Sequence, residues 1–283
     1  MGKHRDNSKE LNTEKRELHF HLYLSPYLKD QYIRIYDVLA DTHARTYKAI
    51  YEPLKTNIDA VAEEYKEEAE NVLEGRFHSE YSDYGDFMES VRDYVYERID
   101  QQFLMHYQFE LMSLSNLYQV FEQQIRKWLY EEITHHENEF INEVIFIHIN
   151  DKNKNAYDTF YGDFGKITNV LTELKLTFKD LFGNEELIVE TDLWKTIREC
   201  NLLSNTYKHG SGHSASNLFA LCPDYFEKVS NTRLMDMYRT TNLERVLNVE
   251  KICFEKYSSA MKEFWENMKE HQRGTMKMNV TNS

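Results

Sequence analysis

The chain has 283 residues, enough for one large domain or two smaller ones, and hydrophobic residues make up 41% of it, which suffices for a core. Its formal net charge of −14 argues against broad, non-specific binding of polyanions, although a local basic patch or a cleft between subunits is compatible with this balance. Only three prolines and nine glycines punctuate the sequence, which disfavours a turn-rich β-sandwich and favours long helices.

The cysteines and the apolar segments indicate the compartment. Three widely spaced cysteines argue against a secreted disulfide framework and fit a reducing cytoplasm. No stretch approaches the roughly 20 apolar residues that cross a bilayer, and the polar first residues lack the apolar centre of a signal peptide. We therefore expect a cytoplasmic protein that does not interact with a membrane.

The first hundred residues predict one strand followed by helices. Residues 18–24 alternate between apolar and polar or ring-bearing side chains, a strand pattern that needs a partner strand. Ser25-Pro26 has the form of an N-cap followed by proline at the first helical position. Helices are expected from there to about Gly75, with Pro53 separating two of them, and residues 76–85 have the composition of a loop.

A long helix is predicted next, running as far as His136. Its apolar seam has alternating spacings of three and four: Leu111, Leu114, Tyr118, Phe121, Ile125 and Trp128. Residues 140–149 are apolar and ambiguous between a helix end and a strand. Residues 150–155 predict a loop, the best candidate for a flexible connection.

The last part of the chain predicts three further helices. One runs from Tyr157 to Phe178 and ends at Gly183-Asn184, and the next is capped by Thr191 or Asp192. After a small-residue loop and one helical turn at 216–221, the last helix runs from Val249 to Met268. The expected organisation is thus a helical N-terminal extension, a bundle of four major helices and a flexible tail: residues 1–103, 104–271 and 272–283.

The segment from Leu193 to Gly210 carries the strongest functional signal. At about 100° per residue, Arg198, Asn205 and His209 share one helix face. The opposite side is built to pack: Ile197, Cys200, Ser204 and Tyr207. Gly210 favours a helix stop, so His209 lies on the last turn, where the carbonyl end of a helix favours a protonated imidazole. Such a row suits phosphate binding and proton transfer.

Two segments of this chain resemble the HEPN superfamily: Leu114–Ile125 on the first bundle helix and Arg198–Gly210 on a later one. Members are all-α bundles that commonly dimerise, and many are metal-independent ribonucleases of bacterial defence and toxin–antitoxin systems. The resemblance covers somewhat more than half of the chain. It implies an all-α HEPN-like bundle that forms a homodimer, binds RNA such as tRNA in an inter-subunit cleft, and uses no cofactor. An antitoxin or another defence-system protein is the implied partner.

The chain departs from the family signature, which is an Arg followed four to six residues later by a His. Placing His209 on the family's histidine puts Ser204 where the close arginine would stand, with Asn205 as the following polar residue. The nearest upstream arginine is Arg198, on the same helix face. The segment Arg16–His21 satisfies the spacing, but it lies in a strand-like region, where chance is the better explanation.

The candidate site follows from what RNA cleavage without a metal needs: a group that takes a proton, a group that returns one, and positive charge on the phosphate. We assign the phosphate clamp to Arg198, the orientation of the imidazole or the ribose to Asn205, and proton transfer to His209. Further substrate-binding candidates are Lys208, Asn201 and His213.

Three alternatives stay open. In the first, His209 and Lys208 only satisfy the last carbonyls of the helix, while Arg198 and Asn205 are solvated. In the second, the core has lost its chemistry and binds a partner protein, a nucleotide or RNA; the missing close arginine and the acidic balance favour it. In the third, the chain is a structural scaffold.

No metal site is expected. Glu132 and His135 have the spacing of carboxylate-bridged metal sites, but no second motif accompanies them. The pairs His19 with His21 and His209 with His213 have no defined third ligand.

Overall fold

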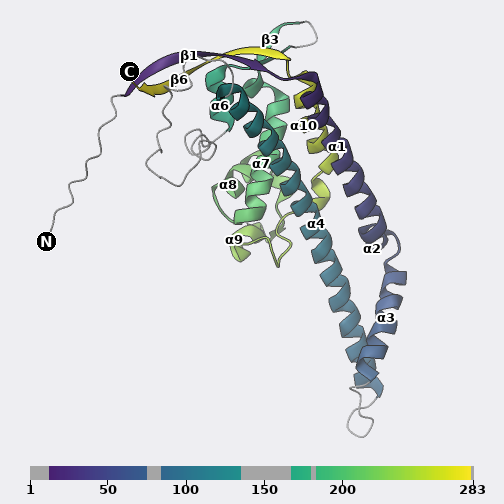
Figure 1. Ribbon diagram of the computed structural model, residues 1–283. Helices are drawn as coiled ribbons and strands as arrows, with labels where there is room; N and C mark the ends of the chain where they lie inside the picture. The colour runs from purple at the N-terminus through teal and green to yellow at the C-terminus, as the bar shows by residue number, and fades with distance from the viewer. Residues whose placement is uncertain (1–12, 75–83, 135–166, 180–182, 282–283) are drawn as a thin grey trace, which may run out of the picture. The chain divides into compact units, whose positions relative to one another are not determined.

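The computed structural model describes residues 13–74, 84–134, 167–179 and 183–281, and these are mostly helical, as the sequence predicts (Figure 1). Within these ranges the strands pair in antiparallel, two-stranded sheets: β1 with β6, β2 with β3, and β4 with β5. The chain divides into two compact units. Unit 1 comprises Met1–Ile33, Gln119–Lys195 and Met261–Ser283, and unit 2 comprises Arg34–Tyr118 and Thr196–Ala260.

This division differs from the expected one. The predicted boundary between residues 103 and 104 falls inside a single helix, α4, which spans Tyr84–Thr134. The helix is continuous there because neither proline nor glycine interrupts it after Gly85. Its apolar seam is buried as predicted, whereas its predicted end at His136 and the segments 140–149 and 150–155 lie outside the described residues.

A long two-stranded ribbon in unit 1 gives the predicted N-terminal strand its partner. Strand β1 (Thr13–Tyr23) pairs with β6 (His271–Thr281), from Thr13 opposite Thr281 to Tyr23 opposite His271 (Figure 1). The C-terminal residues predicted as a flexible tail therefore form a strand. The tail looks polar because only alternate residues face inward, and two of the buried ones in β6 are Gln272 and Gly274.

Unit 1 also corrects the predicted helix from Tyr157 to Phe178. Its described part is the helix α6 (Ile167–Leu174), and the chain then enters strand β2 (Thr177–Lys179), which pairs with β3 (Glu185–Leu187). The buried side chains after the helix alternate at every second residue: Leu174, Leu176 and Phe178. A spacing of four from Leu174 to Phe178 fits a helix and a strand equally well, which explains the error.

Aromatic side chains form the core of unit 1. The buried rings come from α4, from the first turn of α7 (Asp192–His209) and from α10 (Phe254–Asn267): Phe121, Trp128, Trp194, Phe264 and Trp265. The Phe121 and Phe264 rings pack edge to face with centroids 5.0 Å apart, and the Trp128 and Trp265 rings do so at 6.1 Å. Such pairs add to the stability that burial of their area provides.

Helix α1 (Pro26–Thr46) begins at the predicted cap, where the Leu28 N–H donates to the Ser25 hydroxyl at 3.2 Å. The segment that follows belongs to unit 2 and breaks at Pro53, as predicted. There the π-turn η1 (Tyr47–Tyr51) precedes the helices α2 (Pro53–Thr56) and α3 (Ile58–Glu74). The Glu52 N–H donates to the Tyr47 carbonyl at 2.9 Å, which is the i to i−5 bond of a π-turn.

The rest of unit 2 consists of short elements around α7: α8 (His213–Leu221), η3 (Pro223–Tyr225), β4 (Lys228–Val229), β5 (Thr232–Arg233), α9 (Leu234–Tyr238) and η4 (Val249–Lys251). Two predicted bounds are corrected. Helix α8 begins at His213, before the predicted single turn, and α10 begins only at Phe254 because Val249 belongs to the separate turn η4. None of the described helices combines the length and apolar composition needed to cross a bilayer.

Candidate functional site

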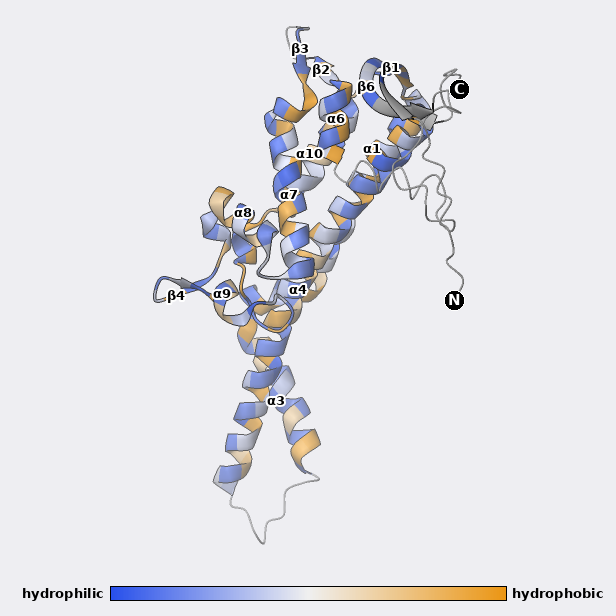
Figure 2. Ribbon diagram, turned by 90° about the vertical axis from the view of Figure 1, so that its left-hand side faces the viewer, coloured by the Kyte–Doolittle hydropathy of each residue, from blue (hydrophilic) through white to orange (hydrophobic). Residues whose placement is uncertain are grey.

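Helix α7 begins and ends where the sequence predicts. At its start the Thr191 hydroxyl accepts a hydrogen bond from the Trp194 N–H at 3.1 Å, so Thr191 is the cap. At its end Gly210 has a φ of +65°, and its N–H donates to the Thr206 carbonyl at 2.8 Å. His209 is the last helical residue, and polar and apolar residues are interleaved along the helix (Figure 2).

The end of α7 is held by the segment that follows α9. The Thr241 hydroxyl donates to the Tyr207 carbonyl at 2.7 Å, and the Ser211 N–H donates to the Arg239 carbonyl at 3.0 Å. A Cβ atom at Gly210 would lie 2.1 Å from the Arg239 carbonyl oxygen. Only glycine fits this contact, so the turn after His209 is fixed in position.

Lys208 and His209 project from this fixed turn. Both side chains are exposed, and within the described part of the chain neither forms a hydrogen bond or an ion pair. The Thr206 and Tyr207 carbonyls have other donors, namely Gly210 and Thr241. The alternative in which Lys208 and His209 satisfy the last carbonyls is therefore not what the structure contains.

The other predicted site residues lie further from the helix end. Arg198 is half-buried and donates to the Asn201 side-chain oxygen at 3.1 Å, and Asn205 is half-buried between them and His209. Arg198 and His209 share a face, but eleven residues of helix separate them by about 16 Å along the axis. They cannot contact one phosphate group. His213 is exposed on α8, beyond the break at Gly210.

The packing side of α7 is confirmed. Ile197 and Cys200 are buried, and the buried Ser204 shares a hydrogen bond with Ser115 of α4 at 3.1 Å. Ser204 stands where the family's close arginine would be. Because this position is fully buried, an arginine there would point into the packed interior and not toward a substrate.

A carboxylate cluster that the sequence gave no reason to expect lies on the remaining side of α7. Glu199 accepts hydrogen bonds from the Tyr257 hydroxyl at 2.5 Å, the Tyr225 hydroxyl at 2.8 Å and the Lys256 ammonium at 2.8 Å. Burial acts to raise the pKa of Glu199, but the bonds from Lys256, Tyr257 and Tyr225 outweigh it and lower this pKa. The cluster joins α7 to η3 and α10 within unit 2.

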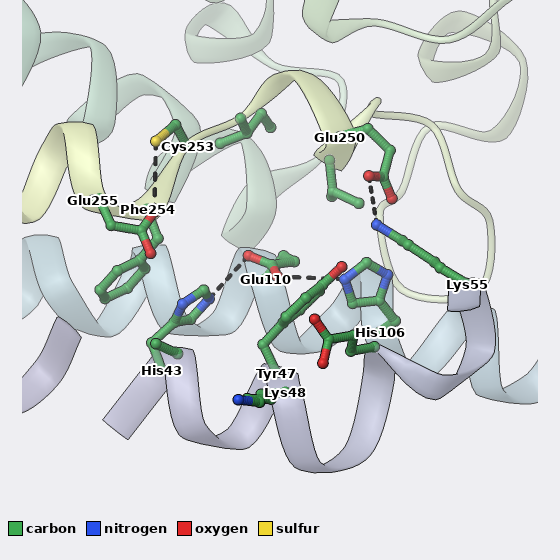
Figure 3. A pocket seen from close by; sticks show the side chains of 14 residues that line it. His43, Tyr47, Lys48, Lys55, His106, Glu110, Glu250, Cys253, Phe254 and Glu255 are labelled. Carbon is green, nitrogen blue, oxygen red and sulfur yellow. Dashed lines mark hydrogen bonds and ion pairs between the residues drawn. The ribbon is translucent and has the colours of Figure 1, made fainter. Parts of the chain in front are cut away.

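The cavity shown in Figure 3 lies elsewhere in unit 2 and has a volume of about 430 Å³. Glu110 of α4 lies between two imidazoles: its oxygens are 3.0 Å from the His43 Nε2 and 3.3 Å from the His106 Nε2. The His43 ring also stacks between the rings of Phe109 and Phe254, with centroids 5.0 Å and 4.1 Å away. The sequence hint was the four-residue spacing of His106 and Glu110, which sets both on one helix face.

The charges around this cavity make it a poor site for a phosphate. Four glutamates and two lysines line it: Glu52, Glu110, Glu250, Glu255, Lys48 and Lys55. Lys55 is already paired with Glu250 at 2.5 Å. The described residues contain no group of three or more histidine, cysteine, aspartate or glutamate side chains with the geometry of a metal site. We therefore interpret the His43, Glu110 and His106 cluster as structural.

This interpretation predicts acid sensitivity. Burial acts to raise the pKa of Glu110, but its bonds to His106 and His43 outweigh burial and lower it from 4.5 to about 2. Because the folded pKa is the lower one, the stabilisation is present above pH 4.5 and is lost as the pH falls toward about 2. Glu110→Gln should destabilise the protein by about 3 kcal/mol near neutral pH, and by much less near pH 2.

Urea unfolding of the parent and of Glu110→Gln across this pH range checks that expectation. Glu63→Gln, at an exposed carboxylate paired only with Lys66, is the matched control. A stability difference between parent and Glu110→Gln that stays constant down to about pH 2 would contradict the structural role.

Comparison with known proteins adds no assignment: no family model, no curated protein and no solved structure matches the chain.

Proposed function

We propose that this chain is a HEPN-like, metal-independent endoribonuclease of a bacterial defence or toxin–antitoxin system. His209 transfers protons, and Arg198 and Lys208 bind phosphates of the RNA strand. Because about 16 Å of helix separates Arg198 from His209, Arg198 binds a phosphate away from the bond that is cut. Lys208, next to the imidazole, contacts the phosphate at the cut.

The chemistry is a transfer within the RNA. The 2′ oxygen forms a bond to the adjacent phosphorus as its proton leaves, and the bond from phosphorus to the 5′ oxygen breaks as that oxygen gains a proton. The products are a 2′,3′-cyclic phosphate and a 5′ hydroxyl. A protonated His209 supplies the second proton, and His209 of a second copy in a two-fold dimer removes the first.

One observation carries the proposal. The turn after α7 is fixed by Gly210 against Arg239, and the last carbonyls have donors of their own, so Lys208 and His209 are exposed with no partner among the described residues. A cation and an imidazole held in this way suit a phosphate that is about to change its charge distribution.

The experiment that tests the proposal is incubation of the purified chain with end-labelled RNA and tRNA in EDTA. We expect shortened products that carry cyclic phosphate and 5′ hydroxyl ends. RNA that stays intact in EDTA and in the presence of divalent metal would contradict the proposal.

A second candidate is an HEPN-like module that binds a partner protein or RNA without cutting it. The observation that favours it is the burial of Ser204, which leaves no arginine within one turn of His209 on the exposed face. It predicts a stable complex recovered from cells together with no RNA turnover, and efficient metal-free cleavage would exclude it.

A further inference from the structure

The outer face of the β1–β6 ribbon in unit 1 is rich in cationic and ring-bearing side chains. Opposing residues of the two strands alternate between a buried and an outward face. The outward residues are Glu17, His19, His21, Tyr23, His271, Arg273, Thr275 and Lys277. We call this set the ribbon face. It carries one acidic side chain, although the chain as a whole has 48 acidic and 34 basic residues.

A hollow of about 370 Å³ opens beside the ribbon face. It is lined by His19 and His21 of β1, Arg273 of β6 and Lys175, and its lining within the described chain includes no carboxylate. His21 lies directly opposite Arg273 in the register. None of these four side chains forms an ion pair with another described residue.

Backbone geometry brings Lys175 to this hollow. Gly274 of β6 faces Leu174, the last residue of α6, so closely that a Cβ atom would lie 2.9 Å from the Leu174 carbonyl oxygen. Lys175 then follows with a φ of +53°, a left-handed conformation that favours glycine. Lysine at a position that suits glycine is explained if its side chain has a use.

Like charges set opposite each other in a two-stranded sheet repel, so a cluster of this kind is completed by an anion. At one end of the ribbon face the Tyr23 and His271 rings stack at 4.9 Å, and Tyr23 remains 38% exposed. Nucleic-acid bases stack on such rings, while their phosphates bind neighbouring cations. The outward residues include no aliphatic side chain that would enter a lipid layer.

We propose that the ribbon face binds single-stranded RNA, with phosphates on Arg273, Lys175 and the two imidazoles of the hollow and a base on Tyr23. The choice of RNA rests on the proposed function, but the binding needs no cleavage. It assigns a role to the strand that carries the Arg16–His21 spacing, whose histidines act here as part of a binding surface.

The test is fluorescence anisotropy with a labelled 2′-O-methyl oligoadenylate, which cannot be cut through its 2′ oxygen. At about 0.1 M salt each lost phosphate contact costs about fivefold in affinity, and the slope of log K against log salt falls by about 0.7. Lys175→Gly/Arg273→Thr should therefore bind about 25-fold more weakly, with a slope lower by about 1.4.

Lys175→Gly alone separates binding from folding. Glycine suits the left-handed φ, so this variant should melt at the parent temperature or above it while binding about fivefold more weakly. Lys127→Ala/Lys195→Ala is the charge-matched control, since both lysines are exposed in unit 1 and pair with their own helix neighbours. It should bind as the parent does.

Unchanged affinity of Lys175→Gly/Arg273→Thr, or an equal loss in the control, would overturn the inference. Binding to anionic vesicles but not to the oligonucleotide would also overturn it. The two proposals fail separately: a parent that binds through the ribbon face but leaves RNA intact refutes only the ribonuclease, and a parent that cleaves while the ribbon variants bind normally refutes only the ribbon face.

Discussion

Replacing His209 by alanine should slow metal-free RNA cleavage by about 10²- to 10⁴-fold, the range for a lost general acid or base. The imidazole is exposed and has no partner among the described residues, so its removal should leave thermal stability unchanged. The measurement is the initial rate on labelled RNA in EDTA, together with the melting temperature of the parent and the variant.

Asn217→Ala is the matched control for this prediction. Asn217 is exposed on α8 and forms no interaction within the described residues. It should cleave at the parent rate. A His209→Ala variant that folds and still cleaves like the parent would remove the imidazole from the mechanism.

Gly210→Ala should have the largest effect on stability. Its φ of +65° costs an alanine about 1–2 kcal/mol, and the new Cβ would lie 2.1 Å from the Arg239 carbonyl oxygen. Either the end of α7 or the segment after α9 must move, so we expect a total loss of about 3 kcal/mol or more. The measurement is the free energy of unfolding in urea.

Two other glycines divide this loss into its causes. Gly183 also has a positive φ of +83°, but nothing lies within 4 Å of its missing Cβ, so Gly183→Ala should cost only about 1–2 kcal/mol. Gly212 has open space and an ordinary φ, so Gly212→Ala should change stability by about 0.5 kcal/mol or less. Equal effects at Gly210 and Gly183 would show that the Arg239 contact is unimportant.

Helices with strong local signals could be predicted from the sequence. The seam of α4, the cap at Thr191, the break at Pro53 and the stop at Gly210 each depend on residues within a few positions of one another. Strand β6 could not be predicted, because its inward residues acquire meaning only opposite β1, about 250 residues away. Likewise, the period of Leu174 and Phe178 was compatible with either a helix or a strand.

The candidate site was predictable as a helix face but not as a three-dimensional arrangement. The 100° rule put Arg198 and His209 on one side and Ser204 on the other, and the burial of Ser204 agrees with this. The same rule says nothing about distance along the axis unless the rise is counted. Contacts between distant segments, such as Arg239 against Gly210 or His43 against Glu110, leave no local pattern.

The central claim is that the polar face of α7 lies along an RNA strand, with His209 at the phosphate that reacts. The most direct measurement is an NMR titration of the uncleavable 2′-O-methyl oligonucleotide into ¹⁵N-labelled protein, observing the imidazole of His209 and the guanidinium of Arg198. The account predicts that both signals shift together with one dissociation constant. Signals that stay in place while the oligonucleotide binds would contradict it.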